Sequence, residues 1–298
     1  MPAGGNFIDT ANKYTNGTSE RYVGEFIASE RDKFVLATKY SLSTRQGDPN
    51  AGGNHRKNMV QSLEASLKRL NTDYIDLYWV HIWDELTPVD EVMRALDDMV
   101  RSGKVLYIGI SDTPAWVIAQ ANTLADFRGW SRFVGLQVPY NLVRRDVEQE
   151  LLPMARAFDM AVAAWAPLAA GVLTGKYNTS TDEQRRYSED GVSEHDRALA
   201  ALVMKIADEI GRRPSQVAIN WVRQQQRGVI IPIIGARSER QIKENLASLD
   251  FTLTPEQLQQ LNKASDYQPL FPHSFLGDQQ IQSLIHSTTL PLIDRHRH

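Results

Sequence analysis

The chain contains no cysteine among its 298 residues. Disulfide bonds, thiolate nucleophiles and cysteine-bound zinc or iron–sulfur clusters are therefore excluded. The seven histidines are scattered along the chain and show no spacing typical of metal ligands. We therefore expect no metal site.

The chain also lacks a long apolar run and an excess of basic charge. Its longest nearly unbroken apolar stretch, Met160–Leu173, is too short to span a bilayer and contains a proline. The opening MPAGGNFIDT has no basic segment followed by an apolar one and does not resemble a signal peptide. The formal net charge of −3 offers no basic surface to nucleic acid or anionic lipid. We expect a cytoplasmic protein that acts on small molecules, without nucleic-acid or membrane partners; the oligomeric state stays open.

What the sequence does contain is a sustained alternation of short apolar runs and helical patterns. Apolar residues make up 42% of the chain and charged residues 23%, as in ordinary globular proteins. Because the runs are apolar on both faces, they are typical of parallel strands covered by helices. We expect strands at Asn6–Asp9, Phe34–Lys39, Ile75–Val80, Val105–Ile110, Phe133–Val138, Ala161–Ala166 and Val229–Ile234.

Helices are expected between these runs. Apolar residues recur at helical spacing over Val60–Leu70 and over Val92–Met99, and the second helix should stop near Gly103. Thr113-Pro114 and Thr254-Pro255 each resemble an N-cap followed by proline at the first helical position. Strand–helix alternation in a chain of this length favours an α/β fold of the (β/α)8 TIM-barrel type. Only seven strands are visible, so we expect the first β/α unit to be missing from this sequence.

Two parts of the chain interrupt this pattern. The polar stretch 178–196 is expected to be a mobile surface loop. The barrel domain is expected over residues 1–276, with a C-terminal tail over 277–298. The loop, the tail after Leu270 and Trp83 are candidate walls of a substrate pocket.

Four chemically different side chains lie at the carboxyl ends of the first three strands, where barrel enzymes carry their active sites. Asp9 ends the first strand, Tyr14 lies five residues beyond it, Lys39 ends the second strand, and His81 follows the third. This set suits carbonyl reduction, because a neutral tyrosine hydroxyl can give a proton to the developing alkoxide. A neighbouring ammonium would stabilise the phenolate that remains, Asp9 would hold that ammonium, and His81 could hydrogen-bond the carbonyl oxygen.

Each residue also has an ordinary structural interpretation. An isolated aspartate at a strand end usually caps a turn, and a lone lysine there is usually solvated. Taken singly, His81 and Tyr14 are more often structural than catalytic. The joint placement at successive strand ends favours catalysis. A barrel glycosidase that pairs Asp9 with Asp84 or Glu85 is a further alternative.

The motifs GGNFIDTANKYTNGTSE, LATK, DLYWVH and GIS occur in the order found in aldo-keto reductases, which the chain resembles from about Gly4 to Leu276. The run DLYWVHIWDELTPVDEVMRALDDMVRSGKVLYIGISDTPAW is similar to the branch of aryl-alcohol dehydrogenases and norsolorinic-acid-reductase-like proteins. The resemblance implies a (β/α)8 barrel, NADP(H) as cofactor, a small carbonyl substrate and a catalytic tetrad of Asp9, Tyr14, Lys39 and His81. A non-catalytic NADP(H)-binding protein, or a truncated inactive one, is the alternative within this family.

The resemblance also implies the cofactor-binding residues. No G-x-G-x-x-G follows a strand, so a Rossmann site is not indicated. Nicotinamide contacts are expected at Ser111, Asp112, Gln137 and Trp165. Pyrophosphate contacts are expected in the segment that holds Leu168, Gly171 and Lys176. The adenosine 2′-phosphate is expected at Gly235, Arg237, Gln241 and Asn245.

One of these segments departs from the family pattern. The family's WSPLGGGLLTGK is here WAPLAAGVLTGK, so Ala166 lacks a hydroxyl, and Ala169 and Ala170 replace glycines. If those positions require a positive φ, alanine costs about 1 kcal/mol or more there. We expect weaker cofactor binding as a result.

Overall fold

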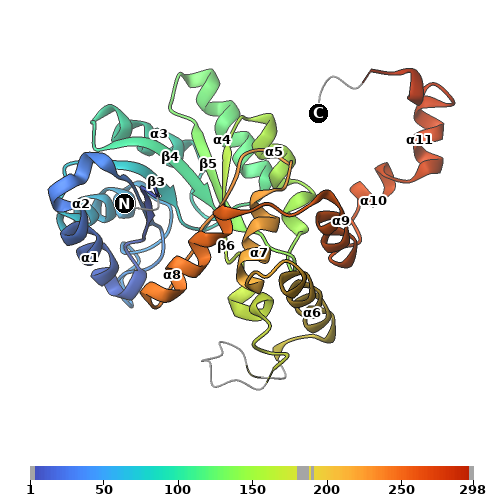
Figure 1. Ribbon diagram of the computed structural model, residues 1–298. Helices are drawn as coiled ribbons and strands as arrows, with labels where there is room; N and C mark the ends of the chain where they lie inside the picture. Colours follow the sequence, from blue (N-terminus) through green and yellow to red (C-terminus); the bar gives the residue numbers. More distant parts are fainter. Residues whose placement is uncertain (1–3, 180–187, 189–190, 295–298) are drawn as a thin grey trace.

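The computed structural model describes residues 4–179, 188 and 191–294, and it contains one parallel sheet of seven strands (Figure 1). All seven expected strands are confirmed, with ends that differ from the expected ones by at most two residues. Their bounds are β1 Phe7–Asp9, β2 Val35–Tyr40, β3 Ile75–Val80, β4 Val105–Ser111, β5 Phe133–Pro139, β6 Ala161–Trp165 and β7 Ile230–Pro232.

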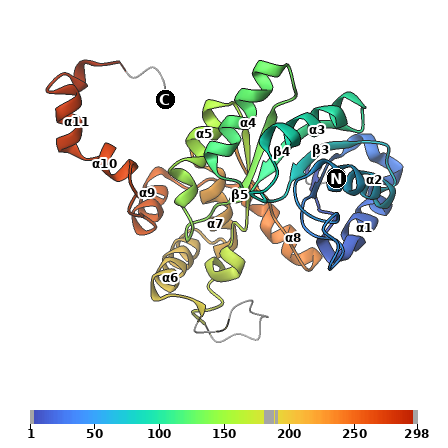
Figure 2. The same ribbon diagram turned by 180° about the vertical axis from the view of Figure 1, so that it is seen from behind.

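Helices separate successive strands and cover the outer side of the sheet (Figures 1 and 2). The α-helices are α1 Thr18–Ile27, α2 Arg56–Leu70, α3 Val89–Arg101, α4 Ala115–Arg128, α5 Leu151–Ala157, α6 Glu194–Glu209, α7 Pro214–Arg223, α8 Glu239–Leu246, α9 Pro255–Ala264, α10 His273–Leu276 and α11 Gln279–His286. Two short 3-10 helices matter for the site, η1 Tyr14–Gly17 and η4 Ala169–Thr174.

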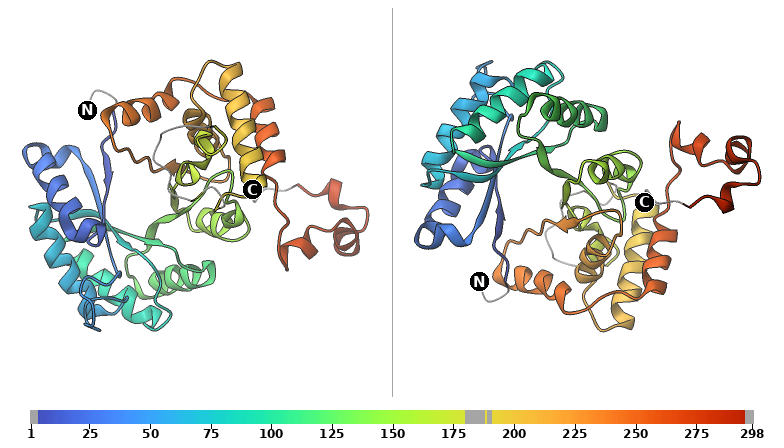
Figure 3. Two further views of the ribbon diagram at one scale, coloured as in Figure 1. Left: turned by 90° about the horizontal axis from the view of Figure 1, so that it is seen from below. Right: turned by 90° about the horizontal axis from the view of Figure 1, so that it is seen from above.

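The strands follow one another in chain order, β1 to β7, and the sheet curls as it does so (Figure 3). Within the described residues, β1 pairs only with β2, and β7 pairs only with β6. The fold is therefore an α/β half-barrel that follows the (β/α)8 plan without closing on itself.

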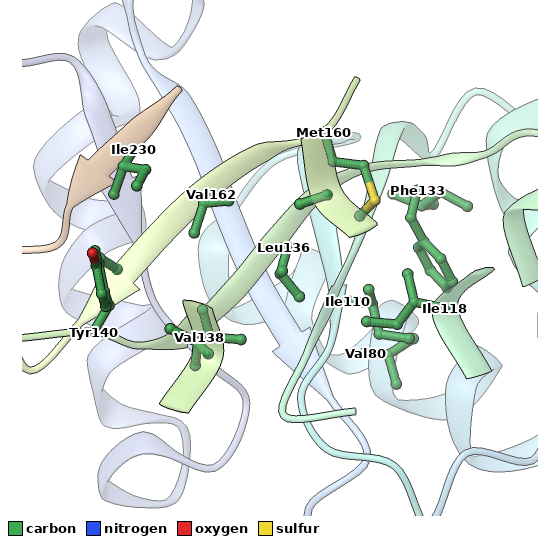
Figure 4. Close-up of a cluster of buried hydrophobic side chains, with 14 of the residues drawn as sticks. Val80, Ile110, Ile118, Phe133, Leu136, Val138, Tyr140, Met160, Val162 and Ile230 are labelled. Atoms are coloured by element: carbon green, nitrogen blue, oxygen red, sulfur yellow. The ribbon is translucent and has the colours of Figure 1, made fainter. Parts of the chain in front are cut away.

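Large aliphatic side chains on the outer face of the sheet form the main hydrophobic core with the helices (Figure 4). The outward positions on the central strands include Val80, Ile110, Leu136 and Val162, which are all 1% exposed or less. Because side chains alternate between faces along a strand, the residues between them point into the curl. Burial of the outer face fixes which residues point inward.

The inner face is only partly covered. By strand register, Phe7, Tyr107 and Ile231 share the inner face with Leu77 and Ala163, yet about half of each of the first three side chains is exposed (49%, 59% and 53%). The open sheet therefore leaves part of its apolar inner face uncovered.

The two expected helix caps had different outcomes. The Thr254 hydroxyl accepts from the N–H of Gln257 at the start of α9, and the Gln257 side chain completes a capping box. The expected Thr113 cap of α4 is wrong, because Pro114 occupies the N-cap position. The Thr113 hydroxyl instead donates to the carbonyl of Ser111.

The C-terminal helices α10 and α11 project away from the half-barrel (Figures 1 and 2). The start of the tail contacts the body, where the Leu270 N–H donates to Gln149 Oε1 at 2.9 Å and the His273 ring of α10 lies 3.4 Å from Glu150. The expectation that the tail after Leu270 walls the substrate pocket is wrong for α11, which projects beyond these contacts (Figure 1). Most of the expected loop 178–196 lies outside the described residues. Among the described helices, none combines the length and hydropathy needed to cross a membrane.

The contact between α1 and α2 predicts the effect of replacing Gly24 by alanine. Helix propensity favours the replacement, whereas packing opposes it. A Cβ atom at Gly24 would lie 2.6 Å from the backbone carbonyl carbon and oxygen of Leu70, which cannot move aside easily. Alanine gains up to about 1 kcal/mol in helix propensity, but overpacking against backbone costs about 1–3 kcal/mol. We expect Gly24→Ala to lower the free energy of unfolding measured in urea. Glu25→Ala, at an exposed position of the same helix, should change it by less than about 0.5 kcal/mol; a more stable Gly24→Ala variant would contradict the packing argument.

Candidate active site

The carboxyl ends of β1, β2 and β3 bring together the four side chains expected to form the catalytic tetrad. Asp9 is the last residue of β1, Lys39 lies near the end of β2, and His81 directly follows β3. Tyr14 begins η1, just beyond β1. Backbone bonds from Thr10 and Asn12 to β2 continue the ladder past β1 and hold this segment in place.

Lys39 is the centre of the cluster, with a side chain that is completely buried. Its ammonium forms an ion pair with the Asp9 carboxylate and donates to the Thr10 carbonyl oxygen at 2.9 Å and to the Tyr14 hydroxyl oxygen at 3.3 Å. An ammonium has three N–H donors, so every donor has an acceptor. A buried charge is costly unless it is paired and hydrogen-bonded, and this geometry supplies both to the Lys39 ammonium beside the tyrosine hydroxyl.

Gln137 links the cluster to the far side of the curl. Its side-chain amide on β5 donates to Asp9 Oδ1 at 3.2 Å, while the other carboxylate oxygen pairs with Lys39. Sequence reasoning placed Gln137 at the nicotinamide and missed this bond. The available signal was that both residues lie at or near the carboxyl ends of strands in the same sheet.

His81 faces Tyr14 edge-on, with ring centroids 5.7 Å apart and an interplanar angle of 83°. Burial, with a smaller effect from the Lys39 charge, lowers the pKa of His81 from 6.5 to about 4. Its imidazole is therefore neutral at physiological pH and presents one donor and one acceptor nitrogen. Its Nδ1 is buried and has no hydrogen-bond partner among the residues that the structure describes.

Asp112 and Trp165 extend the site along the next strands. The Trp165 indole N–H donates to Asp112 Oδ1 at 3.3 Å, which fixes the plane of the ring. Burial raises the pKa of Asp112, although the bond from Trp165 and the Lys39 charge oppose this shift. Ser111 and Gln137 lie in register on β4 and β5 beside them, so the four expected nicotinamide contacts are neighbours at this edge.

The segment after β6 contains three alanines that depart from the family pattern: Ala166 replaces a serine, and Ala169 and Ala170 replace glycines. Ala166, Ala169 and Ala170 have φ values of 52°, 47° and 55°, in the left-handed region where alanine is strained. Ala169 and Ala170 therefore have the positive φ at which alanine is expected to cost stability. Gly171 has φ 94°, and a Cβ there would lie 2.6 Å from Lys176 Cε, so Lys176 crosses directly over this turn. The Leu168 carbonyl accepts from the N–H groups of Gly171 and Leu173 and closes the turn.

The segment after β7 is organised by two side chains of α8. Gln241 accepts from the Arg237 N–H at 2.9 Å, and the Asn245 amide donates to the Gly235 carbonyl at 3.4 Å. The Ser238 hydroxyl caps α8. Gly235 has no positive φ, and a Cβ there would meet nothing within 4 Å, so the structure does not require glycine at this position. Since β6 and β7 are neighbours, both candidate phosphate segments leave the same edge of the sheet.

Three other expectations can be compared with the structure. Asp84 accepts four hydrogen bonds, from Asn54, Leu86 and Thr87, and therefore holds a loop together. Asp9 is paired with Lys39, and Asp84 is held in its loop. The structure therefore favours neither as a member of a glycosidase carboxylate pair. Trp83 is partly buried against the main core. Within the described part of the chain, no three His, Asp or Glu side chains are grouped so that they could hold a metal ion.

The fold and these side chains define a half-barrel protein with a Lys–Asp ion pair, a tyrosine and a neutral histidine at its carboxyl edge. The model of the aldo/keto reductase family matches residues 1–266, and the chain belongs to this family. It is 38% identical to an aryl-alcohol dehydrogenase [NADP(+)] of Phanerodontia chrysosporium, over 95% of this chain and 78% of that protein. It is 37% identical to a putative aryl-alcohol dehydrogenase of Saccharomyces cerevisiae, over 93% of this chain and 77% of that protein. It is also 37% identical to a norsolorinic acid reductase of Aspergillus flavus, over 94% of this chain and 73% of that protein.

The lowered pKa of His81 predicts an acid-dependent loss of stability. A histidine that folds neutral, with its pKa near 4 instead of 6.5, favours the folded state above pH 6.5, and this contribution is lost as the pH falls from 6.5 to 4. We expect His81→Gln to make the decline of the unfolding free energy over that window shallower, by at most about 3 kcal/mol. The unfolding free energy of both proteins is measured by urea titration at several pH values. The exposed His195 supplies the control His195→Gln, and an equal change in both variants would contradict this account.

The left-handed alanines predict a stabilising substitution. At φ 55°, Ala170 is strained by about 1–2 kcal/mol, and glycine relieves this strain while losing up to about 1 kcal/mol of chain entropy. We expect Ala170→Gly to raise the free energy of unfolding by up to about 1 kcal/mol in urea denaturation. Ala236, which is absent from the positive-φ residues, supplies the control: Ala236→Gly should lower it by about 0.4–1 kcal/mol. Equal losses in both variants would exclude strain at Ala170.

Proposed function

We propose that this protein reduces aldehydes or ketones to alcohols with NADPH, and that Tyr14 donates the proton. Membership of the aldo/keto reductase family implies NAD(P)H-dependent carbonyl reduction. The proposal that Tyr14 donates the proton rests on one observation. The Lys39 ammonium is shared between the Asp9 carboxylate and the Tyr14 hydroxyl.

The proton chemistry follows from that arrangement. Hydride addition to a carbonyl carbon leaves negative charge on the oxygen, which must be protonated. The Tyr14 hydroxyl supplies this proton, and the Lys39 cation 3.3 Å away stabilises the phenolate that remains. Tyr14 is 41% exposed, so the phenolate can recover a proton from water once the alcohol has left. Neutral His81 lies beside the tyrosine ring and would hydrogen-bond the carbonyl oxygen.

The residues at the carboxyl edge fit a nicotinamide dinucleotide. Bound NADPH would supply the hydride. Gln137 keeps its amide oxygen available while its amide N–H groups face Asp9, and Ser111 lies beside it. Asp112 and Trp165 would hold the carboxamide and the ring face, and the α8 N-terminus with Arg237 would bind the 2′-phosphate. The phosphate contacts distinguish NADP from NAD.

An aromatic carbonyl compound is the substrate class that we infer. The printed names of the relatives include aryl-alcohol dehydrogenases from two fungi. In this chain Tyr14 and His81 provide aromatic surface at the reacting end of the site.

The test is NADPH oxidation by purified protein with benzaldehyde. We expect Tyr14→Phe to reduce kcat by about 10²-fold or more, because it removes the proton donor, while the NADPH Kd stays nearly unchanged. Tyr22→Phe, at a 68%-exposed tyrosine of α1, is the matched control and should retain full activity. Full turnover by Tyr14→Phe would exclude the mechanism. NADPH binding without turnover in any variant would favour the non-catalytic alternative.

A further inference from the structure

Helix α2 buries a polar stripe beside its apolar one. The apolar side chains that it packs into the main core include Met59, Leu63, Leu67 and Leu70. Asn58, Ser62 and Ser66 recur every four residues along the same helix, and all three are buried as well. An apolar stripe is enough to bury a helix against a sheet. Because buried polar side chains need hydrogen-bond partners, the polar stripe indicates contacts of another kind.

Ser62 connects α2 to the segment that carries Tyr14. The Asn12 side-chain amide donates to the Ser62 hydroxyl oxygen at 3.3 Å, and this hydroxyl donates to Asn58 Oδ1 at 3.2 Å. Asn12 lies in the loop after β1, two residues before Tyr14, and is 2% exposed. Asn12 Oδ1 is buried without a partner, so among the described residues the bond to Ser62 is the only one that this side chain makes.

Asn58 continues the connection to the loop after β2. Its side-chain amide donates to the Gly53 carbonyl oxygen at 2.7 Å. The side-chain amide of the next residue, Asn54, donates to the Ile82 carbonyl oxygen at 2.9 Å. Ile82 directly follows His81. A path of hydrogen bonds, continued by the peptide link between Gly53 and Asn54, therefore runs from the loop after β1 to the loop after β3.

The side chains of Tyr14 and His81 are themselves held at few points. Tyr14 is 41% exposed, and the Lys39 ammonium reaches only its hydroxyl oxygen, at 3.3 Å. Nδ1 of His81 has no hydrogen-bond partner among the described residues. The two rings meet edge-on, with centroids 5.7 Å apart. Their separation therefore depends on the loops that carry them, which are the loops that the hydrogen-bond path connects.

We propose that Asn12, Ser62 and Asn58 are positioning residues that fix the separation of Tyr14 and His81. In the proposed reduction both side chains act on the same carbonyl oxygen, so a change in their separation takes one of them out of reach. A misplacement of about 1 Å at a reacting centre can lower the rate by about 10²-fold. The kinetic consequence rests on the proposed reductase function, whereas the fixed ring geometry does not.

The ring geometry is tested without enzyme activity, by the nuclear Overhauser effect (NOE) between the ring protons of Tyr14 and His81. The two sets of signals are assigned by their loss in Tyr14→Phe and His81→Gln. We expect Ser62→Ala to lose most of this NOE, because it leaves the Asn12 amide without its acceptor. Asn12→Ala breaks the path outside the helix and should have the same effect. An unchanged NOE in either variant would overturn the proposal.

Ser66→Ala is the matched control, because Ser66 is a buried serine of the same helix, one turn beyond Ser62. Its hydroxyl accepts from the Arg69 guanidinium at 3.3 Å and has no bond to the loop of Tyr14. Both serine variants lose a buried hydroxyl, but only Ser62→Ala breaks the path. The NOE should persist in Ser66→Ala. An equal loss in both variants would show that the stability of α2 alone determines the geometry and would overturn the proposal.

The kinetic arm measures kcat with NADPH and benzaldehyde. We expect Ser62→Ala to lower kcat by about tenfold or more. The NADPH Kd should stay nearly unchanged, because none of the expected cofactor contacts lies on the path. An unchanged kcat in Ser62→Ala would overturn the link to catalysis. An inactive wild type would instead refute the proposed function and leave the NOE to decide on the ring geometry.

A double variant tests whether the bonds act as one path. Asn12 and Asn58 bond to opposite sides of the Ser62 hydroxyl. Residues that share a partner have non-additive effects. The double variant Asn12→Ala with Asn58→Ala should therefore lose no more activity than the more impaired of the two single variants. Losses that multiply would contradict a single path.

Discussion

The buried ammonium of Lys39 is the constraint on which the rest of the site depends. A charge without solvent must have acceptors for all its N–H groups, and here they come from Asp9, Thr10 and Tyr14. The loop after β1 must therefore stay close to β2, and its backbone bonds to β2 keep it there. The Gln137 amide then occupies the second oxygen of Asp9 and ties β5 to the same centre. One cation thus sets the positions of side chains from three strands.

Residues in left-handed conformations gather around this centre. Among the described residues, eleven non-glycine residues have positive φ, and eight of them lie in the segments that follow the carboxyl ends of the strands, namely Thr15, Asn16, Ser41, Glu85, Asp112, Ala166, Ala169 and Ala170. Such conformations persist only where the surrounding structure determines them, and they are common at functional sites. Ala169 and Ala170 adopt left-handed conformations that glycine would adopt without strain, which is expected to cost stability.

Much of this architecture could be predicted from the sequence because it follows from local patterns. Each strand is a short apolar run, and strand ends in a parallel sheet share one edge, so the neighbourhood of Asp9, Lys39 and His81 was accessible without coordinates. The bond between Gln137 and Asp9 was not, because it depends on how tightly the sheet curls. The fit of Trp79 against Gly109 depends on side-chain packing between strands, which no periodicity reports. The cap of α4 was misplaced by one residue because the Thr113 hydroxyl has a competing acceptor nearby.

The hydrogen bond between Asp9 and Gln137 joins residues 128 positions apart in the chain. Contacts of such sequence separation form slowly, since the entropy of closing the intervening chain must be lost before they can contribute. The strands β2, β3 and β4 lie between β1 and β5 in the sheet, so their pairing brings these two side chains together. The complete hydrogen-bonded centre is therefore a late product of folding, and a nascent chain that has not yet released β5 can form the Lys39 ion pair without the brace from Gln137.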